Sequence, residues 1–436
     1  MKHRGGLALL VLLACHPALA AVYHAGPGDY RALLPRLQPG DELVLRAGVY
    51  RRGLPIHRLQ GRAGAPIVIR GADPAAPPLF LARPGHNTVS LVDAAHVVIR
   101  NLVLDGRGLP VNGVKAEGHA RWTHHITVEG LLIRNHDYNQ QMVAISTKCP
   151  SWGWVIRGNV IRRAGTGIYL GDSDGGDPFV AGLIEYNLVS ETLGYNLQIK
   201  HQRGRPDIAE LRRPRQTTII RHNVFSKARG NGRVELARPN VLVGHWPPSG
   251  AGAEDYYQIY GNFFYQNPDE ALFQGEGNIA LYNNLFVNYH GSAVHIQPHN
   301  DIPRRVDVFF NTVVAARHGI RVLPGPQGGG AWRQRLLGNA VFAGLPLQGG
   351  EQEANVSGAY VEAGRYLRAP FAPLGALDLS GLAGKLALPP PAARWWRAYR
   401  DAARDFDGLW RDLFQPGAYR HAARPLWRPR LEPKPR

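Results

Sequence analysis

Sulfur is scarce in this chain of 436 residues, which contains two cysteines and two methionines. Two cysteines can form at most one disulfide bond, so the sequence excludes a small disulfide-stapled scaffold. Cys15 lies in an N-terminal segment that we expect to be removed, which leaves Cys149 alone. No motif of a catalytic thiol surrounds Cys149, and we therefore predict a buried structural side chain.

Long apolar runs and acidic residues are also in short supply. No segment after the N-terminus reaches the roughly 20 apolar residues of a membrane-spanning helix, so no transmembrane span is predicted. The 33 Asp and Glu residues stand against 51 Lys and Arg, which gives a formal net charge of +18. Such an excess favours a polyanionic partner. Because no motif of a nucleic-acid-binding module is present, we predict an acidic polysaccharide and no nucleic acid.

The first 20 residues have the features of a signal peptide. A basic start is followed by a short apolar stretch and by an A-x-A pattern that ends at Ala20. We therefore predict that residues 1–20 are removed and that the protein is secreted or periplasmic. An alternative stays open, because the run Leu-Leu-Ala-Cys that ends at Cys15 resembles a lipobox, which would anchor the chain as a lipoprotein.

A repeat of short β-prone runs, each containing an asparagine, occupies the middle of the chain. Successive asparagines are 22 to 39 residues apart, a spacing typical of a solenoid. Each unit reads as a strand, the asparagine, a second strand, a turn with glycine and a third strand. Stacked units bury their apolar faces against each other, and each asparagine can hydrogen-bond to the coils above and below. The nine asparagines are Asn101, Asn135, Asn159, Asn187, Asn223, Asn262, Asn284, Asn311 and Asn339.

Both ends of the repeat resemble those of a known architecture. The run PGDELVLRAGVY (39–50), with a helix predicted before it over residues 30–37, is similar to the N-terminal cap of secreted right-handed parallel β-helix proteins of the pectin-lyase-like type. The DxDG…GAY run (405–419) resembles their closing segment. The resemblance implies an all-β, right-handed parallel β-helix solenoid with an N-terminal cap and a short helical or irregular C-terminal appendage. We expect the cap and first coil at 21–60, coils at 61–350, the closing segment at 351–420 and a basic, disordered tail at 421–436.

Three insertions interrupt consecutive coils, at residues 171–179, 201–216 and 238–256. Because equivalent turns stack on one side of a solenoid, the insertions should wall a groove. Strand alternation predicts an outward-facing stripe along this groove. Its members are Tyr169, Gln198, Glu235, Phe273, His295 and Arg321. In the next outward column, Lys200 lies in a trough between Gly171 and Ala237, and Arg221 is predicted on the surface one coil away.

The segments QIKHQ (198–202) and TIIRHNVF (218–225) resemble the alginate lyase and chondroitinase B family of polysaccharide lyases. The resemblance implies that Lys200 is the catalytic base and Arg221 the acid in β-elimination of a uronate-containing polysaccharide. A lysine with a lowered pKa can take the C5 proton, and an arginine can bind the carboxylate through two hydrogen bonds. The predicted substrate contacts are Tyr169, Gln198, His201, Arg203, Arg238, His245, His295 and Gln297.

The same family usually holds Ca²⁺ through asparagine and glutamate ligands just before the lysine. Here the paired glutamates are absent, and the run before Lys200 offers Glu191 and Asn196. Ca²⁺ is therefore a possible cofactor rather than a certain one. The candidate ligands are Asp172, Asp174, Asn196 and Glu235.

Other functions remain open. C5 epimerisation removes the same proton and returns it on the other face. A glycoside hydrolase would use two carboxylates as acid and base, and the candidates are Asp172, Asp174, Asp177, Glu185 and Glu235. A non-catalytic glycan-binding or surface protein is the third alternative. We expect a monomer in each case.

Overall fold

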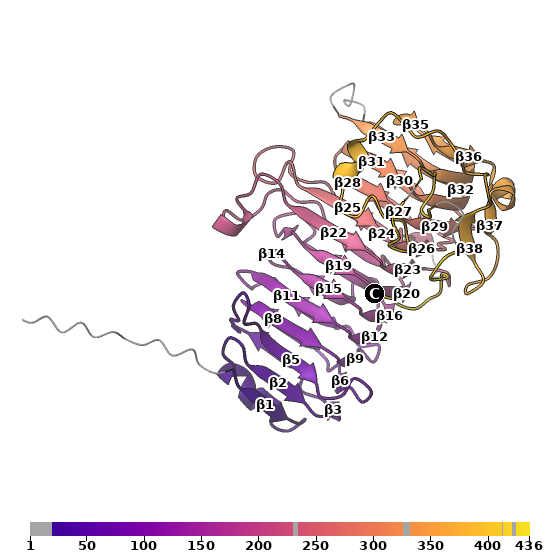
Figure 1. Ribbon diagram of the computed structural model, residues 1–436. Coiled ribbons are helices and arrows are strands. Elements are labelled where there is room, and N and C mark those ends of the chain that lie inside the picture. Colours follow the sequence, from indigo (N-terminus) through magenta and orange to yellow (C-terminus); the bar gives the residue numbers. More distant parts are fainter. Residues whose placement is uncertain (1–19, 230–233, 326–331, 412, 421–423) are drawn as a thin grey trace, which may run out of the picture.

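The structure is a computed structural model that describes residues 20–229, 234–325, 332–411, 413–420 and 424–436. The predicted signal segment therefore lies, except for its last residue, outside the described residues. Strands of three parallel sheets follow one another around each coil, so the chain is a parallel β-helix (Figure 1). The strands form because apolar and polar residues alternate, as in β8 (Ala95–Arg100), where every second side chain is buried.

Sheet A contains the strand before each asparagine corner. Its strands, in order along the solenoid, are β1 (Val22–Ala25), β2 (Glu42–Leu45), β5 (Ile67–Gly71), β8, β11 (Thr123–Glu129), β15 (Val155–Arg157), β19 (Leu183–Glu185), β22 (Thr217–Arg221), β25 (Tyr256–Tyr260), β28 (Gly277–Tyr282), β31 (Pro303–Phe309), β33 (Gln334–Leu337) and β35 (Glu351–Glu353), with β14 (Ser151–Trp152) and β18 (Phe179–Val180) at one side.

Sheet B contains the strand after each corner. Its strands are β3 (Val49–Tyr50), β6 (Leu79–Leu81), β9 (Val103–Asp105), β12 (Leu132–His136), β16 (Val160–Ala164), β20 (Leu188–Thr192), β23 (Val224–Ser226), β26 (Phe263–Tyr265), β29 (Leu285–Asn288), β32 (Thr312–Val322), β34 (Ala340–Gln348) and β36 (Val356–Gly358).

Sheet C contains the third strand of each coil. Its strands are β4 (Leu54–His57), β7 (Val89–Val92), β10 (Val114–Ala116), β13 (Val143–Thr147), β17 (Thr166–Leu170), β21 (Leu197–Ile199), β24 (Val241–Val243), β27 (Phe273–Gly275) and β30 (Val294–Ile296). The long strands β32 and β34 continue around the corner from sheet B into sheet C, which joins the two by hydrogen bonds.

The predicted asparagine ladder runs through the corner between sheets A and B. Asn187, for example, accepts hydrogen bonds from the backbone and side-chain amides of Asn159, and its own amide donates to Asn223. The ladder runs from Asn159 to Asn339 and continues to Asn355. Two predicted members do not belong to it: Asn101 takes a left-handed backbone conformation (φ 55°), and Asn135 donates to Asp105 instead.

The ends of the solenoid are capped by short irregular elements. The predicted N-terminal helix is present as α1 (Tyr30–Leu33) followed by η1 (Leu34–Arg36). The second insertion contains η2 (Ala209–Leu211), and η3 (Val234–Leu236) lies just before β24. The C-terminal segment contains η4 (Tyr360–Arg365), η5 (Trp395–Ala398) and the antiparallel pair β37 (Leu367–Ala369) and β38 (Asp378–Gly381). No helix in the described ranges is both long and apolar enough to cross a lipid bilayer.

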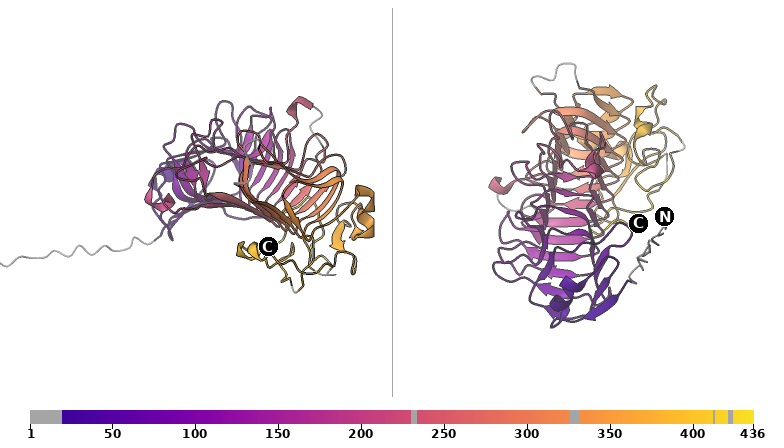
Figure 2. Two further views of the ribbon diagram at one scale, coloured as in Figure 1. Left: turned by 90° about the horizontal axis from the view of Figure 1, so that it is seen from above. Right: turned by 90° about the vertical axis from the view of Figure 1, so that its left-hand side faces the viewer.

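The C-terminal segment runs back along the solenoid, so that the C-terminus lies beside the middle coils (Figures 1 and 2). Trp427 packs against Phe263 of β26, and Arg436 forms an ion pair with Glu129 of β11. The predicted disorder of the tail is therefore wrong for residues 424–436, whereas 421–423 lie outside the described residues. The error has a clear cause: Trp427 and the largely apolar stem of Lys434 are buried against the fold.

Candidate functional site

Lys200 directly follows β21 at the edge of sheet C, where the insertions begin. β21 pairs with β17 on one side and with β24 on the other, which places Gly171 and Gly244 beside Lys200. A Cβ atom on Gly244 would lie 2.3 Å from the backbone nitrogen of His201, so no side chain fits there. The residues that flank Lys200 on the neighbouring coils are therefore Gly171 and Gly244 rather than Gly171 and Ala237, and we call the position between these two glycines the Lys200 trough.

The position of Ala237 was misassigned because the sheet C strand of this coil begins later than expected. That strand is β24, and the segment proposed for it forms the short helix η3. The predicted start of the third insertion at residue 238 is therefore wrong as well, because β24 lies inside the range 238–256 and the insertion follows it. The residue opposite Gln198 is consequently Leu242 rather than Glu235, which is exposed. On the following coil the outward residue is Gln274, while Phe273 points into the core.

The side chain of Lys200 is half-buried, and burial lowers its pKa below the usual value for a lysine amine. The nearby carboxylates of Glu276 and Asp172 oppose this shift. Among the described residues no carboxylate forms a direct ion pair with Lys200. An amine in this state can accept a proton more readily than an exposed lysine.

A second lysine lies on the same side of sheet C. Lys148 follows β13, two coils before Lys200, and its Nζ atom lies 3.7 Å from the ring centre of Tyr169. Burial and the charges of Lys115 and Lys200 lower the pKa of Lys148 to about 8, although Asp172 opposes the shift. Two amines with lowered pKa values thus share one surface, which sequence reasoning did not find. The signal was present, because Lys148 ends its strand in the same way as Lys200.

Glu276 closes the other side of the trough and was also missed. It follows β27 and is only 2% exposed, and its carboxylate accepts hydrogen bonds from the backbone N–H groups of Asn300 and Asp301 at 2.9 and 3.1 Å. These contacts fix a negative charge near Lys200. The correct register of β27 would have revealed Glu276.

The two predicted histidine contacts lie together at the start of the insertions. The rings of His201 and His245 are stacked with their centres 5.1 Å apart. Burial, His245 and Lys200 lower the pKa of His201, which favours its neutral form. Nδ1 of His245 donates to the backbone oxygen of Trp246 and lies 3.7 Å from a carboxylate oxygen of Asp301. The second insertion contacts the first and the third here: the side-chain amide of Gln202 donates to the backbone oxygen of Phe179, and its backbone N–H donates to the backbone oxygen of His245. The groove that the insertions were predicted to wall stays a prediction.

Arg221 is not part of this arrangement. It ends β22 of sheet A, whereas Lys200 follows a strand of sheet C. Its guanidinium donates to Glu185 at 2.7 Å and to the hydroxyl of Tyr260 at 3.0 Å, and Glu185 also binds Arg157. Arg221 thus belongs to a row of ion pairs across neighbouring coils. Its predicted partnership with Lys200 finds no support in this geometry, and a catalytic role for Arg221 stays a prediction.

Glu185 and the proposed Ca²⁺ ligands are dispersed. The carboxylate of Glu185 is held between two arginines, which removes it from a hydrolase pair. Asn196 lies inside the solenoid before β21 and bonds to Thr192 and to the backbone of Ser226, whereas Asp172 follows β17 at the opposite strand end. The set Asp172, Asp174, Asn196 and Glu235 is therefore not brought together. Ca²⁺ dependence stays a prediction.

The aspartates of the first insertion mainly cap their own loop. Asp172 accepts from the backbone N–H of Asp177, and Asp174 accepts from that of Gly176. Burial and the neighbouring charges of Asp172 and Asp174 raise the pKa of Asp177. Of the three, Asp172 is the one whose charge acts on both Lys148 and Lys200.

The remaining predicted substrate contacts lie on sheet C strands or near one or the other end of these strands. Tyr169, Gln198 and His295 lie in one outward stripe across β17, β21 and β30, as predicted. Arg203 is exposed in the second insertion, and Gln297 follows β30. Arg238 precedes β24 and lies beyond the strand end opposite to Lys200. Their roles in binding stay predictions.

A group able to bind a transition metal occurs elsewhere, on sheet A. Ligand atoms of His96, His124 and His125 lie within 4.8 Å of one another, and His125 also contacts Glu210 at 2.8 Å. Burial lowers the pKa values of His96 and His124, the latter to about 4, so both rings are neutral near pH 7. Neutral imidazoles are suitable ligands for such ions.

Comparisons with known proteins concern the fold. No protein-family model matches the chain, and no curated protein does. The structure of a GH136 lacto-N-biosidase from Eubacterium ramulus is similar, with a TM-score of 0.54 and 14% identity over 78% of this chain and 68% of that one. Pectate lyase Pel9A also matches, with a TM-score of 0.48 and 12% identity over 92% of this chain and 96% of that one. An alginate lyase from Paenibacillus sp. str. FPU-7 matches with a TM-score of 0.39 and 16% identity over 77% of this chain and 95% of that one.

Proposed function

We propose that this protein is a polysaccharide-active enzyme that cleaves a uronate-containing glycan by β-elimination. The observation that carries the proposal is the half-buried amine of Lys200, which has a lowered pKa and lies in a trough between two glycines. The shared fold with a lacto-N-biosidase supports a glycan substrate only by analogy, because one fold hosts many activities. Export as a secreted or periplasmic protein is part of this proposal, and lipid anchoring through Cys15 is its alternative.

In the proposed reaction, Lys200 removes the C5 proton next to the carboxylate. The electron pair of that C–H bond forms the C4=C5 double bond, and the bond from C4 to the glycosidic oxygen breaks. The ammonium group of Lys148, which is mostly protonated at neutral pH because its pKa is about 8, neutralises the substrate carboxylate. The hydroxyl of Tyr169 supplies the proton to the leaving oxygen, since burial raises its pKa and keeps it protonated.

This assignment moves the acid and the carboxylate partner from Arg221 to residues of sheet C. The C5 epimerase variant uses the same proton removal and needs a donor on the opposite ring face. The stacked pair His201 and His245 offers such a group at the edge of the trough.

A direct test is incubation with alginate, pectate and glycosaminoglycans, with ultraviolet absorbance as the readout of the conjugated double bond. The unaltered protein should produce this absorbance with at least one uronate glycan, and Lys200→Met should abolish it. The matched control is Lys385→Met, which removes an exposed lysine of the C-terminal segment. Equal activity of Lys200→Met and the unaltered protein would reject the proposal, and a chelator tests the Ca²⁺ requirement in the same assay.

Hydrolysis is the second candidate, and one observation favours a specific pair for it. Asp172 follows β17 and Glu276 follows β27, which lie on opposite sides of β21, and both carboxylates act electrostatically on Lys200. New reducing ends without the absorbance of a double bond, lost in Glu276→Gln, would identify this reaction.

A further inference from the structure

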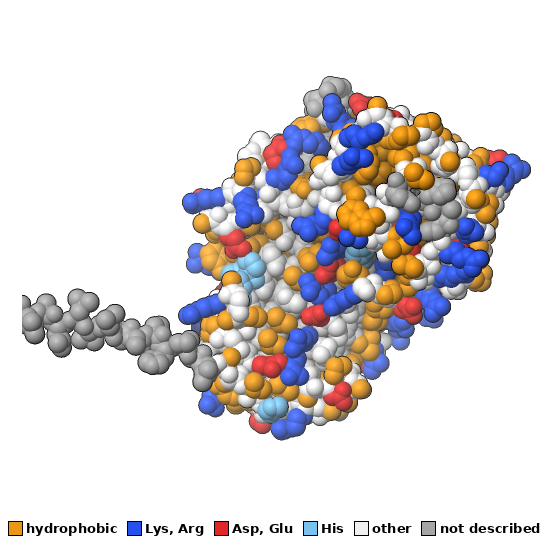
Figure 3. All heavy atoms as spheres, in the orientation of Figure 1, with side chains coloured by type: hydrophobic (Ala, Val, Ile, Leu, Met, Phe, Trp, Pro, Cys, Tyr) orange, Lys and Arg blue, Asp and Glu red, His pale blue; other side chains and the backbone are white. Residues whose placement is uncertain are grey.

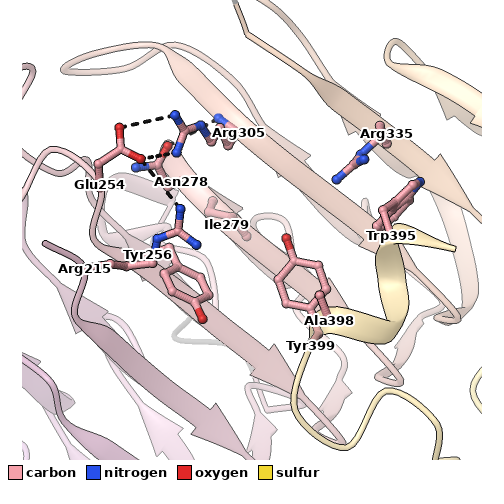
Figure 4. Close-up of a pocket in the computed structure, with 10 residues that line it drawn as sticks. All are labelled: Arg215, Glu254, Tyr256, Asn278, Ile279, Arg305, Arg335, Trp395, Ala398 and Tyr399. Atoms are coloured by element: carbon pink, nitrogen blue, oxygen red, sulfur yellow. Dashed lines mark hydrogen bonds and ion pairs between the residues drawn. The ribbon is translucent and has the colours of Figure 1, made fainter.

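A second concave surface lies on sheet A, away from the Lys200 trough. We call it the arginine groove and define it by Arg215, Arg305, Arg333, Arg335, Tyr256 and Trp395. Two adjoining hollows of about 230 and 440 Å³ form it and share three of the arginines. Figure 4 shows Arg215 and Arg305 on one side and Arg335 with Trp395 on the other. In Figure 3, basic side chains gather over this part of the face, with hydrophobic ones between them.

The groove is separate from the trough although the same insertions border both. Each insertion begins after a strand of sheet C near Lys200 and ends before a strand of sheet A. Arg215 and Glu254 lie at the sheet A ends of the second and third insertions. The opposite wall comes from η5 of the C-terminal segment. The groove therefore lies over β25, β28, β31 and β33, none of which belongs to sheet C.

The groove is positively charged, and its arginines are held in place without using all their donors. The residues that line the two hollows include four arginines, which carry positive charge, and two carboxylates, those of Glu254 and Asp307, which carry negative charge. Arg335 donates to Asp307 through Nε and Nη2, at 2.6 and 2.7 Å, which leaves Nη1 available. Arg305 binds Glu254 through its two terminal nitrogens, which leaves Nε. A guanidinium has five N–H donors, so these side chains can still bind an anion.

Aromatic rings accompany the arginines. The guanidinium of Arg335 lies 3.8 Å from the ring centre of Trp395, and that of Arg215 lies 5.3 Å from Tyr256. Tyr256 and Trp395 are partly exposed. Arg215 also forms an ion pair with Glu254 at 3.7 Å. Partly exposed rings next to guanidinium groups that keep unused N–H donors match a ligand with an apolar sugar face and an anionic substituent.

We infer that the arginine groove is a second, non-catalytic binding site for an anionic sugar unit of a polysaccharide. The arginines bind the carboxylate or sulfate group, and Tyr256 and Trp395 contact the sugar ring. The choice of uronates as first probes rests on the proposed function, but the site itself depends only on the charges and rings of sheet A. A glycan held here would stay attached to the protein whether or not the trough cleaves it.

Binding of a short oligouronate, measured by calorimetry in the Lys200→Met background, tests the inference without turnover. Arg215 and Arg333 are exposed, and replacing both with glutamine should leave the fold intact. The double variant should bind roughly tenfold or more weakly, because charge-assisted hydrogen bonds are lost. The control is Arg212→Gln, which removes an exposed arginine of the same insertion that pairs with Asp207 outside the groove.

The outcomes separate the two proposals. Weaker binding in the double variant alone supports the groove, even if no glycan is cleaved by the unaltered protein. Tighter binding of a sulfated than of a uronate oligosaccharide would identify sulfate as the preferred anion. The inference is overturned by equal binding of the double variant, by equal binding of a carboxyl-reduced neutral oligosaccharide, or by no binding of any anionic oligosaccharide to the unaltered protein.

Discussion

Replacing Asn223 with alanine should destabilise the solenoid strongly. Asn223 is fully buried; its carbonyl oxygen accepts from the backbone and side-chain amides of Asn187 at 3.0 and 2.9 Å, and its amide donates to the backbone of Ile184 at 2.9 Å. The variant leaves about three polar groups without partners in a dry interior. At roughly 1–3 kcal/mol for each group, the loss is on the order of 3–9 kcal/mol.

The assay is chemical unfolding followed by circular dichroism, with transition midpoints as the measure, because a long repeat array need not unfold in one step. Asn101→Ala is the matched control, since Asn101 occupies the same kind of sequence run without joining the ladder, and should cost about 1–2 kcal/mol from its left-handed backbone. Asn355→Ala, at the partly exposed end of the ladder, should fall between the two. A midpoint for Asn223→Ala no lower than that of Asn101→Ala would refute the reasoning.

Three further predictions concern charged and reactive groups. Arg221→Met should lower stability by roughly 2–4 kcal/mol, because it leaves the buried Glu185 with one arginine instead of two; a stable variant that has lost glycan cleavage would instead show a catalytic role. Burial lowers the pKa of Lys148 from 10.5 to about 8, so between these pH values the folded protein binds fewer protons than the unfolded chain and its stability rises with pH. The variant Lys148→Met has no amine at this position and so lacks the rise in stability. The unfolding midpoint of the unaltered protein should therefore increase relative to that of Lys148→Met between pH 7 and pH 10. A difference in midpoint that stays constant over this range would contradict the lowered pKa. Cys149 is fully buried and burial raises its pKa to about 11, so a thiol reagent should label it only after unfolding, and rapid labelling of the native protein at pH 8 would disprove this.

The sequence predicted the solenoid well because its signal is local and repeated. Short apolar strands and the buried asparagines recur on most coils, and each repeat independently indicates the same unit. The cap helix was predicted over residues 30–37, and α1 with η1 covers residues 30–36. The errors occurred where the repeat is interrupted: the segment 227–240 between β23 and β24 hid the start of β24, and Glu235 was placed in a stripe to which Leu242 belongs.

The candidate site could be predicted only in part for the same reason. Lys200 was identified because small residues flank it in the pattern. Glu276 was missed through the register of one strand, and Arg221 was paired with Lys200 because sequence spacing does not reveal which of the three faces a strand occupies. The arginine groove could not be predicted, since η5 meets β28 and β31 only through tertiary packing.

The tail described above changes how the array can lose structure. In an open solenoid each coil contacts only its neighbours, so the end coils can fray while the rest stays folded. Here the contact between Arg436 and Glu129 joins residues 307 positions apart and spans most of the coils. The chain from β11 onward is thereby closed into a loop, and the last coils cannot open without first releasing the tail. Unfolding of this half should be more cooperative than that of the N-terminal coils, which no such strap covers in the described structure.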